Sequence, residues 1–259
     1  MEEYAPLLFA FEHDNVGLIL GSRDKTVKKI MIALDLTDSV VDEAVENSVE
    51  MIVTHHPPIF KPISRITTDD ALGRRLIKLL RNDVTVYSAH TNLDIAHGGT
   101  SDVLAGMLGL ENLVPLDNRH VPAEGCALGR VGDLPEECTL GELAQRLKSL
   151  LGLGAIAVTG DSGRAVRRVG LCTGSASGPD YISMAKSAEC DVYVTGDVTY
   201  HNAQFAADFD IGLIDATHHG TEVIIVKTIK EMLESRAAEN GAELTVIEPQ
   251  ADTRVMHSF

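Results

Sequence analysis

Histidines and carboxylates that could bind metal ions occur in three short clusters of the 259-residue chain. Each cluster places an imidazole beside a second imidazole or a carboxylate: His55 with His56, His90 with Asp94, and His218 with Glu222. Each cluster directly follows an apolar segment that is typical of a β-strand, and open α/β sheets bind ligands at the carboxyl ends of their strands. Mixed nitrogen and oxygen ligands suit zinc, manganese, iron, cobalt or nickel better than magnesium or calcium.

The spacing within the clusters favours two ions over one. His218 and Glu222 are four residues apart, so one helical turn places both on the same face. His55 and His56 are adjacent, and in an extended backbone their side chains would point to opposite sides. We therefore expect a dinuclear centre in which a carboxylate bridges ions about 3.5–4 Å apart.

Three further features have two readings each. His201, after GDVTY, could approach the same site or be structural. Asp35 ends a predicted strand and could support a ligand from behind or cap the next helix. The glycine-rich CTGSASG at 172–178 could cradle a phosphate, but it lacks the lysine of a P-loop, which favours a tight turn between strand and helix.

Alternating strands and helices must position these groups. In the first part of the chain, apolar segments predict strands at 30–36, 51–54 and 84–89, with helices over 40–45, 70–80 and 101–108. A second alternation predicts strands at 156–158, 168–172, 191–195, 211–216 and 244–247, with helices over 140–151, 181–188, after Tyr200 and over 221–237. This order is typical of largely parallel sheets covered by helices.

The segment 115–137 is rich in proline and glycine and is the expected domain boundary. We predict an α/β fold with two interlinked domains of similar layout, each with a mostly parallel sheet flanked by helices. The first domain is expected to comprise residues 1–118 and 224–259, and the second residues 119–223.

Composition restricts the partners and the compartment. The net charge is −16, with 22 Lys and Arg against 38 Asp and Glu, and a nucleic acid would require a basic stripe that the sequence lacks. The four cysteines have no CxxC spacing and are typical of buried thiols in a reducing compartment. No apolar run approaches the roughly 18 residues of a membrane span. We expect a cytoplasmic protein without membrane association.

Six motifs occur in a fixed order along the chain: DNVGLILG at 14–21, ALDLT at 33–37, VTHHPPIF at 53–60, SAHTNLD at 88–94, VYVTGDVTYHNA at 192–203 and IDATHHGTE at 214–222. Over nearly its whole length the chain resembles the GTP cyclohydrolase 1 type 2 homologue family, also called the Nif-three-like proteins. The resemblance implies a dinuclear metal site between two α/β domains and a toroidal homohexamer. It also implies the metal ligands His55, His56, Asp94, His218 and Glu222, with His90 near the metals.

The expected function is a metal-dependent hydrolase of a nucleotide or a related phosphorylated compound. In the version that the family name suggests, water opens the purine ring of GTP and formate is released, with His90 or His201 transferring protons. Two alternatives remain open at this point. One is a metal-dependent phosphoesterase, and the other is a hexameric metal-binding scaffold without catalytic activity.

Overall fold

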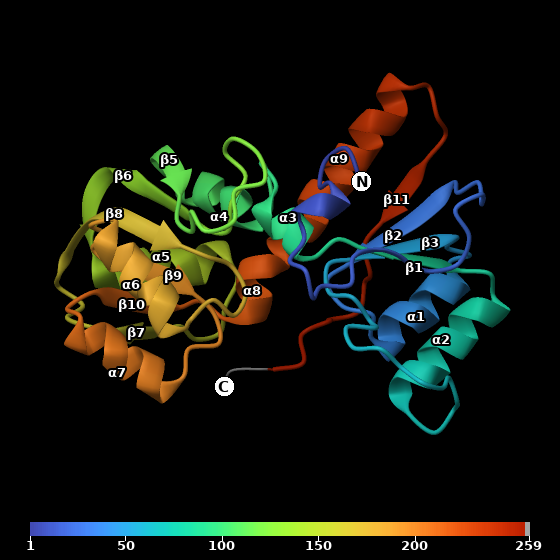
Figure 1. Cartoon of the computed structure of the whole chain (residues 1–259), viewed down its shortest axis with the longest axis horizontal. Helices are drawn as coiled ribbons and strands as arrows, with labels where there is room; N and C mark the ends of the chain where they lie inside the picture. The colour runs from blue at the N-terminus through green and yellow to red at the C-terminus, as the bar shows by residue number, and fades with distance from the viewer. Residues whose placement is uncertain (257–259) are drawn as a thin grey trace. The chain divides into compact units, whose positions relative to one another are not determined.

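The computed structural model describes residues 1–256 and divides into two compact units (Figure 1). The first unit comprises Met1–Leu93 and Ile225–Val255, and the second comprises Asp94–Ile224 together with Met256. The chain thus leaves the first unit and returns to it. The division differs from the expected one at residues 94–118, Ile224 and Met256, which belong to the second unit. Residues 257–259 of the expected first domain lie outside the described part.

The sheet of the first unit has five strands in the order β1-β4-β3-β2-β11. Their bounds are β1 Gly17–Leu20, β2 Lys29–Ala33, β3 Met51–Thr54, β4 Thr85–Ser88 and β11 Thr245–Ile247. Strands β11, β2, β3 and β4 run parallel, and only β1 is antiparallel, at the edge. The sheet is therefore mostly parallel, as the alternation of strands and helices predicts.

Helices α1 (Asp38–Glu46) and α2 (Ala71–Arg81) pack on this sheet. The hydroxyl of Thr37 accepts a hydrogen bond from the backbone N–H of Val40 and so caps α1, and Asp70 caps α2 in the same way. Their apolar faces bury the alternate strand residues of one side, including Met31 and Ile52. Helix α1 starts two residues before, and α2 one residue after, the position that the apolar pattern predicts.

The second unit contains a six-stranded sheet in the order β5-β6-β8-β9-β10-β7. The strands are β5 Glu111–Pro115, β6 Arg130–Thr139, β7 Ala157–Thr159, β8 Ala165–Leu171, β9 Val192–Thr195 and β10 Gly212–Asp215. Only the β8–β9 and β9–β10 pairs are parallel. The expectation of a mostly parallel second sheet is wrong, because both sheet edges are closed by antiparallel strands.

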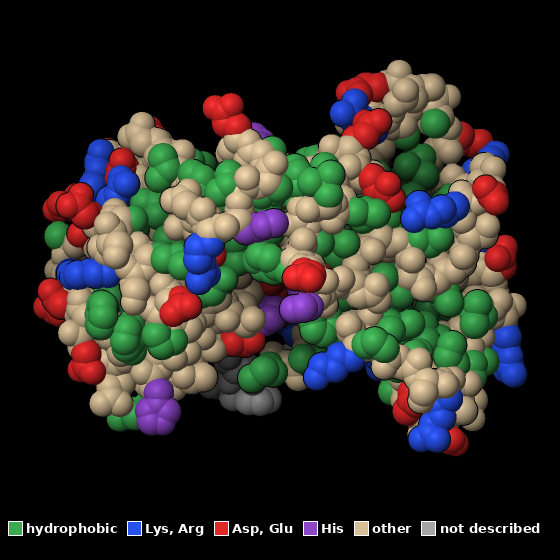
Figure 2. All heavy atoms as spheres, viewed as in Figure 1, with side chains coloured by type: hydrophobic (Ala, Val, Ile, Leu, Met, Phe, Trp, Pro, Cys, Tyr) green, Lys and Arg blue, Asp and Glu red, His purple; other side chains and the backbone are tan. Residues whose placement is uncertain are grey.

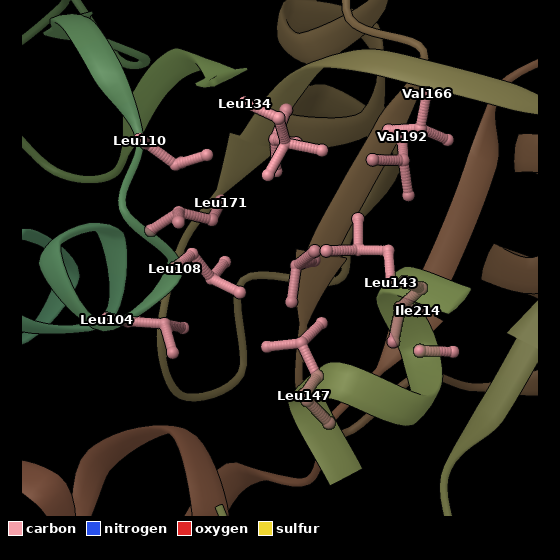
Figure 3. Packing of buried hydrophobic residues seen from close by; sticks show 14 of the residues in the cluster. Leu104, Leu108, Leu110, Leu134, Leu143, Leu147, Val166, Leu171, Val192 and Ile214 are labelled. Atoms are coloured by element: carbon pink, nitrogen blue, oxygen red, sulfur yellow. The ribbon is translucent and has the colours of Figure 1, made fainter. Parts of the chain in front are cut away.

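Helices cover both faces of this second sheet. On one face, α4 (Thr100–Leu108) and α5 (Leu140–Leu150) bury leucines against the strands, as Figure 3 shows for Leu104, Leu108, Leu143 and Leu147. On the other face, α6 (Pro179–Ser187) and α7 (Tyr200–Asp208) pack on Tyr193 and its neighbours. Helix α8 (His218–Glu222) also belongs to the second unit. Helix α3 (Thr91–Ile95) spans the division between the units, and α9 (Ile224–Glu239) belongs to the first unit from Ile225 onward.

The proline-rich segment 115–137 is not a link between domains. It holds the end of β5, a loop, and most of β6, whose pairing with β8 is interrupted by a register shift between Asp133 and Cys138. Pro135 lies within that interruption, which explains how a proline is accommodated in a central strand. The segment 94–118 consequently folds with the second unit, since β5 pairs with β6.

On the face seen in Figure 2, Lys and Arg side chains are scattered among Asp and Glu, without forming a continuous basic stripe. None of the helices between residues 1 and 256 is long and apolar enough to cross a membrane.

Candidate metal centre

Three histidines of the first unit form one cluster at the ends of two neighbouring strands. His55 and His56 follow β3, and His90 follows β4. Their ring centroids lie 5.0 Å (His55 to His56), 5.2 Å (His55 to His90) and 5.6 Å (His56 to His90) apart. Each ring offers a nitrogen, and these nitrogens lie within 4.8 Å of one another. The prediction that His55 and His56 point to opposite sides is wrong, because the backbone bends after Thr54 instead of continuing as a strand.

An oxygen atom lies behind each of the two adjacent imidazoles. The Nδ1 of His55 is 2.8 Å from the backbone oxygen of Ala89, and the Nδ1 of His56 is 2.8 Å from Oδ1 of Asp35. A carbonyl oxygen only accepts hydrogen bonds, so Nδ1 of His55 carries the proton and its Nε2 carries the lone pair. Asp35 supports His56 from behind, which was one of its two expected roles. The helix cap is Thr37.

His90 is held in the same manner by a buried carboxylate. Both carboxylate oxygens of Asp14 lie 2.9 Å from Nδ1 of His90, and Thr91 donates to Asp14 through its backbone N–H. Burial alone would raise the pKa of Asp14, but the hydrogen bonds from His90 and Thr91 outweigh it and lower the pKa to about 2. Asp14 therefore stays ionised, and it orients His90 as Asp35 orients His56.

In the second unit, helix α8 carries an imidazole and a carboxylate that lie in contact. The Nε2 of His218 lies 3.0 Å from Oε2 of Glu222, one helical turn away, as the four-residue spacing predicts. The Nδ1 of His218 lies 2.7 Å from Oδ2 of Asp197. The hydrogen bond to Glu222, followed by that to Asp197, raises the pKa of His218 to about 9, against the effect of burial. Without a metal ion the pair therefore holds a proton at neutral pH.

Two glycines allow the backbone to approach α8 closely. Gly174, with φ of +75°, lies so near Glu222 that an added Cβ would come within 3.0 Å of Oε1. A Cβ added at Gly196 would likewise come within 3.0 Å of backbone atoms of Thr217 and His218. Thr217 itself has φ of +62° and ψ of 148°, which is strained for a β-branched residue, and its hydroxyl accepts a hydrogen bond from Gly220 and caps α8.

Asp94 is a second buried carboxylate of the second unit, on the short helix α3. The hydroxyl of Thr100 donates to its Oδ1 over 2.7 Å, and Thr173 donates in turn to Thr100. Burial raises the pKa of the Cys172 thiol well above its ordinary range, and the negative charges of Asp94 and Glu222 raise it further. Two carboxylates thus act on one buried thiol, which marks a region of the second unit where negative charge accumulates.

Other predicted and unpredicted residues complete the site description. His201 lies exposed on α7 with its ring against Tyr200, and it joins none of the histidine and carboxylate groups found in residues 1–256. The segment 172–178 forms the turn between β8 and α6 that was favoured over a phosphate cradle, and its Gly174 N–H is bonded to Thr221. Sequence reasoning missed the supporting carboxylates Asp14 and Asp197, although both lie in the DNVG and TGD motifs.

The four histidines of these clusters share one arrangement. In each, an oxygen acceptor lies behind Nδ1, which leaves Nε2 as the ring atom that can bind a cation. Histidines that bind metals in proteins are oriented in this way by carboxylates or backbone carbonyls. In the second unit the carboxylates of Asp94 and Glu222 add oxygen donors, and nitrogen and oxygen donors of this kind fit a divalent transition metal or zinc. These residues could therefore hold a metal ion.

Comparison with known proteins gives a consistent result. A model of the Duf34/NIF3 (NGG1p interacting factor 3) family matches residues 1–253. The GTP cyclohydrolase 1 type 2 homolog of Clostridium perfringens is 37% identical over 236 residues, covering 91% of this chain and 89% of the relative. The homolog from Methanocaldococcus jannaschii is also 37% identical, over 238 residues, covering 91% and 92%.

Solved structures show the same fold. A Bacillus cereus protein related to NIF3 superposes with a TM-score of 0.90 at 27% identity, covering 100% of this chain and 96% of that one. A hypothetical protein from Staphylococcus aureus reaches a TM-score of 0.92 at 26% identity with the same coverage. From the family match over almost its entire length, the chain belongs to the Duf34/NIF3 family.

Proposed function

We propose that this protein binds two divalent metal ions per chain and is a metal-dependent hydrolase of a nucleotide-type substrate. The expected ligands are His55, His56, Asp94, His218 and Glu222. His90 is a further candidate. The observation that carries the proposal is the shared support of the four histidines, because orienting four imidazoles through Nδ1 has little purpose without a cation at Nε2. In this proposal the histidine cluster of the first unit and the α8 pair of the second surround the ions together.

Bound divalent ions would supply acidified water and a Lewis acid at a substrate oxygen. The residues of the chain would have the supporting tasks. Asp14, Asp35 and Asp197 hold the protons at Nδ1 of their histidines and fix the ring orientations. His90 would bind a metal ion or accept a proton at Nε2, since Asp14 keeps its Nδ1 protonated.

The substrate class rests on the curated relatives, which are named GTP cyclohydrolase 1 type 2 homologs. Ring-opening hydrolysis of GTP is therefore the first reaction to test, and phosphoester hydrolysis is the second.

We also propose a cytoplasmic location, since the cysteines of the described chain are free thiols, as is typical of a reducing compartment.

Metal binding is tested by elemental analysis after reconstitution with manganese or zinc. The wild-type chain should hold about two ions, as a dinuclear centre requires. His55→Ala and Glu222→Gln should each lose most of the metal, since each removes a ligand from a different unit. Undiminished metal content in both variants would contradict the ligand assignment.

Turnover is tested on GTP and a panel of phosphoesters with the metal-loaded protein. Formate release that disappears in Glu222→Gln supports ring opening, and phosphate release without formate supports a phosphoesterase. A fully metal-loaded protein that hydrolyses none of these compounds would favour the metal-binding scaffold.

A further inference from the structure

The segment 59–66, which follows the HisHisProPro motif, carries positive charge that nothing in the described structure neutralises. Eighteen of the 22 Lys and Arg side chains form hydrogen bonds or ion pairs within residues 1–256. The remaining four have no such partner in that range: Lys61, Arg65, Arg81 and Lys148. Two of the four thus lie in one segment of eight residues, in a chain with a net charge of −16.

The same segment exposes an aromatic ring beside the histidine cluster. Phe60 is 51% exposed, and its ring centroid lies 6.2 Å from that of His90, with the ring planes nearly perpendicular. Exposed large apolar side chains are costly in water, and Ile63 and Ile66 add two more in this segment.

The start of the segment is fixed in place. The side-chain amide of Asn15 donates a hydrogen bond to the backbone oxygen of Ile59, over 2.5 Å. Pro57, Pro58 and Pro62 restrict the backbone on both sides of Phe60. The position of the Phe60 ring relative to His90 is therefore set by the fold of the first unit.

We propose that Phe60, Lys61 and Arg65 bind the substrate of the histidine cluster, a compound with an aromatic ring and a phosphate group. Phe60 stacks against the ring, and Lys61 and Arg65 bind the phosphate. This inference rests on the proposed function for the class of substrate. It concerns how the substrate is bound and not how it reacts. An acidic protein repels a phosphorylated compound unless cations are concentrated near the site, and this segment provides two, Lys61 and Arg65, one and five residues after Phe60. Arginine and lysine are the usual phosphate-binding side chains, and an aromatic face binds a base by stacking.

The test is calorimetric titration of the metal-loaded, full-length protein with three probes: guanosine, inorganic phosphate and GMP. Phe60→Leu should weaken guanosine and GMP binding about tenfold and leave phosphate binding unchanged, because only the stacking is lost. Lys61→Gln and Arg65→Gln should each weaken phosphate and GMP binding about tenfold and leave guanosine binding unchanged. Arg81→Gln is the matched control, since it removes a charge from α2 that is also exposed and has no partner within residues 1–256.

Equal losses in Arg81→Gln would overturn the inference, since general electrostatics would then explain them. Unchanged affinities in the three segment variants, or no GMP binding by wild-type protein at millimolar concentration, would overturn it as well. Metal content is measured in every sample. Normal metal content with unaltered GMP affinity refutes this inference alone, whereas a wild-type protein that binds no metal refutes the proposed function.

Discussion

At the scale of single residues, the protonation of the site histidines is decided by the atoms behind them. A neutral imidazole has one nitrogen with a proton and one with a lone pair, and a hydrogen-bond acceptor at Nδ1 determines which is which. Ala89, Asp14, Asp35 and Asp197 provide that acceptor for the four rings. Three of the four acceptors are carboxylates, and the fourth is the backbone oxygen of Ala89.

Removing a supporting carboxylate should weaken metal binding although every ligand remains. We expect Asp35→Ala and Asp197→Ala each to reduce metal affinity by about 10- to 100-fold, because the ring of His56 or His218 loses its orientation. The measurement is competition with a chelator of known affinity. The asparagine variants should recover part of the loss, since an amide oxygen still accepts from Nδ1.

A matched control for these variants is Asp42→Ala. Asp42 pairs with Lys78 on the surface of α1 and α2, so its removal changes the charge equally but touches no histidine. If Asp42→Ala weakens metal binding as much as Asp197→Ala does, charge rather than orientation is responsible.

The raised pKa of His218 predicts opposite pH effects on stability and on metal binding. Because its pKa in the fold is about 9, above the ordinary 6.5, its pairing with Glu222 stabilises the metal-free protein fully below pH 6.5. That contribution is lost as the pH rises through about 9, so the free energy of unfolding should fall over this range. Metal affinity should rise by about tenfold per pH unit from 7 to 9, because the metal must displace the His218 proton.

Denaturant titration of metal-free protein and chelator competition, both at several pH values, test this prediction. Metal affinity that does not change between pH 7 and 9 would mean that His218 does not lose a proton on binding.

At the scale of secondary structure, glycines let two segments reach α8. Gly174→Ala should displace the Glu222 carboxylate and weaken metal binding about tenfold or more, since the new Cβ would lie within 3.0 Å of Oε1 at a positive φ. It should also destabilise the fold by about 1 kcal/mol, because alanine is strained in that conformation. Chelator competition and thermal unfolding measure the two effects.

Gly178→Ala is the control from the same turn. An added Cβ at Gly178 would have no heavy atom within 4 Å and its φ is negative, so metal affinity should stay at the wild-type value. Wild-type metal affinity in Gly174→Ala would show that Glu222 can move without consequence.

Elements with strong local signals were predictable, and those made by distant pairing were not. The apolar runs identified α1, α2 and β3 to within two residues. Strand β6 contains Gly132 and Pro135 and lies mostly in the segment expected to be the domain boundary, because the strand is held by pairing with β8, far along the sequence. The bend at His55 and His56 was missed for a similar reason. It follows from hydrogen bonds to the backbone oxygens of Ala33 and Leu34, which local pattern does not show.

At the scale of the whole molecule, the resemblance implies an assembly, which we propose to be a homohexamer. Light scattering of the purified protein should give a mass of about 167 kDa, six times the 27.8 kDa of one chain. A mass near 28 kDa over a wide range of protein concentration would contradict this assembly.

Thr217 holds α8 by its hydroxyl cap at the cost of a strained backbone, typically about 1–3 kcal/mol for such a conformation. Glycine at this position would relieve the strain but lose the cap that fixes the first turn of the helix carrying His218 and Glu222. Thermal stability and the geometry of the site therefore favour different residues at position 217. Selection for thermal stability alone is expected to replace this threonine, and selection for metal binding is expected to retain it.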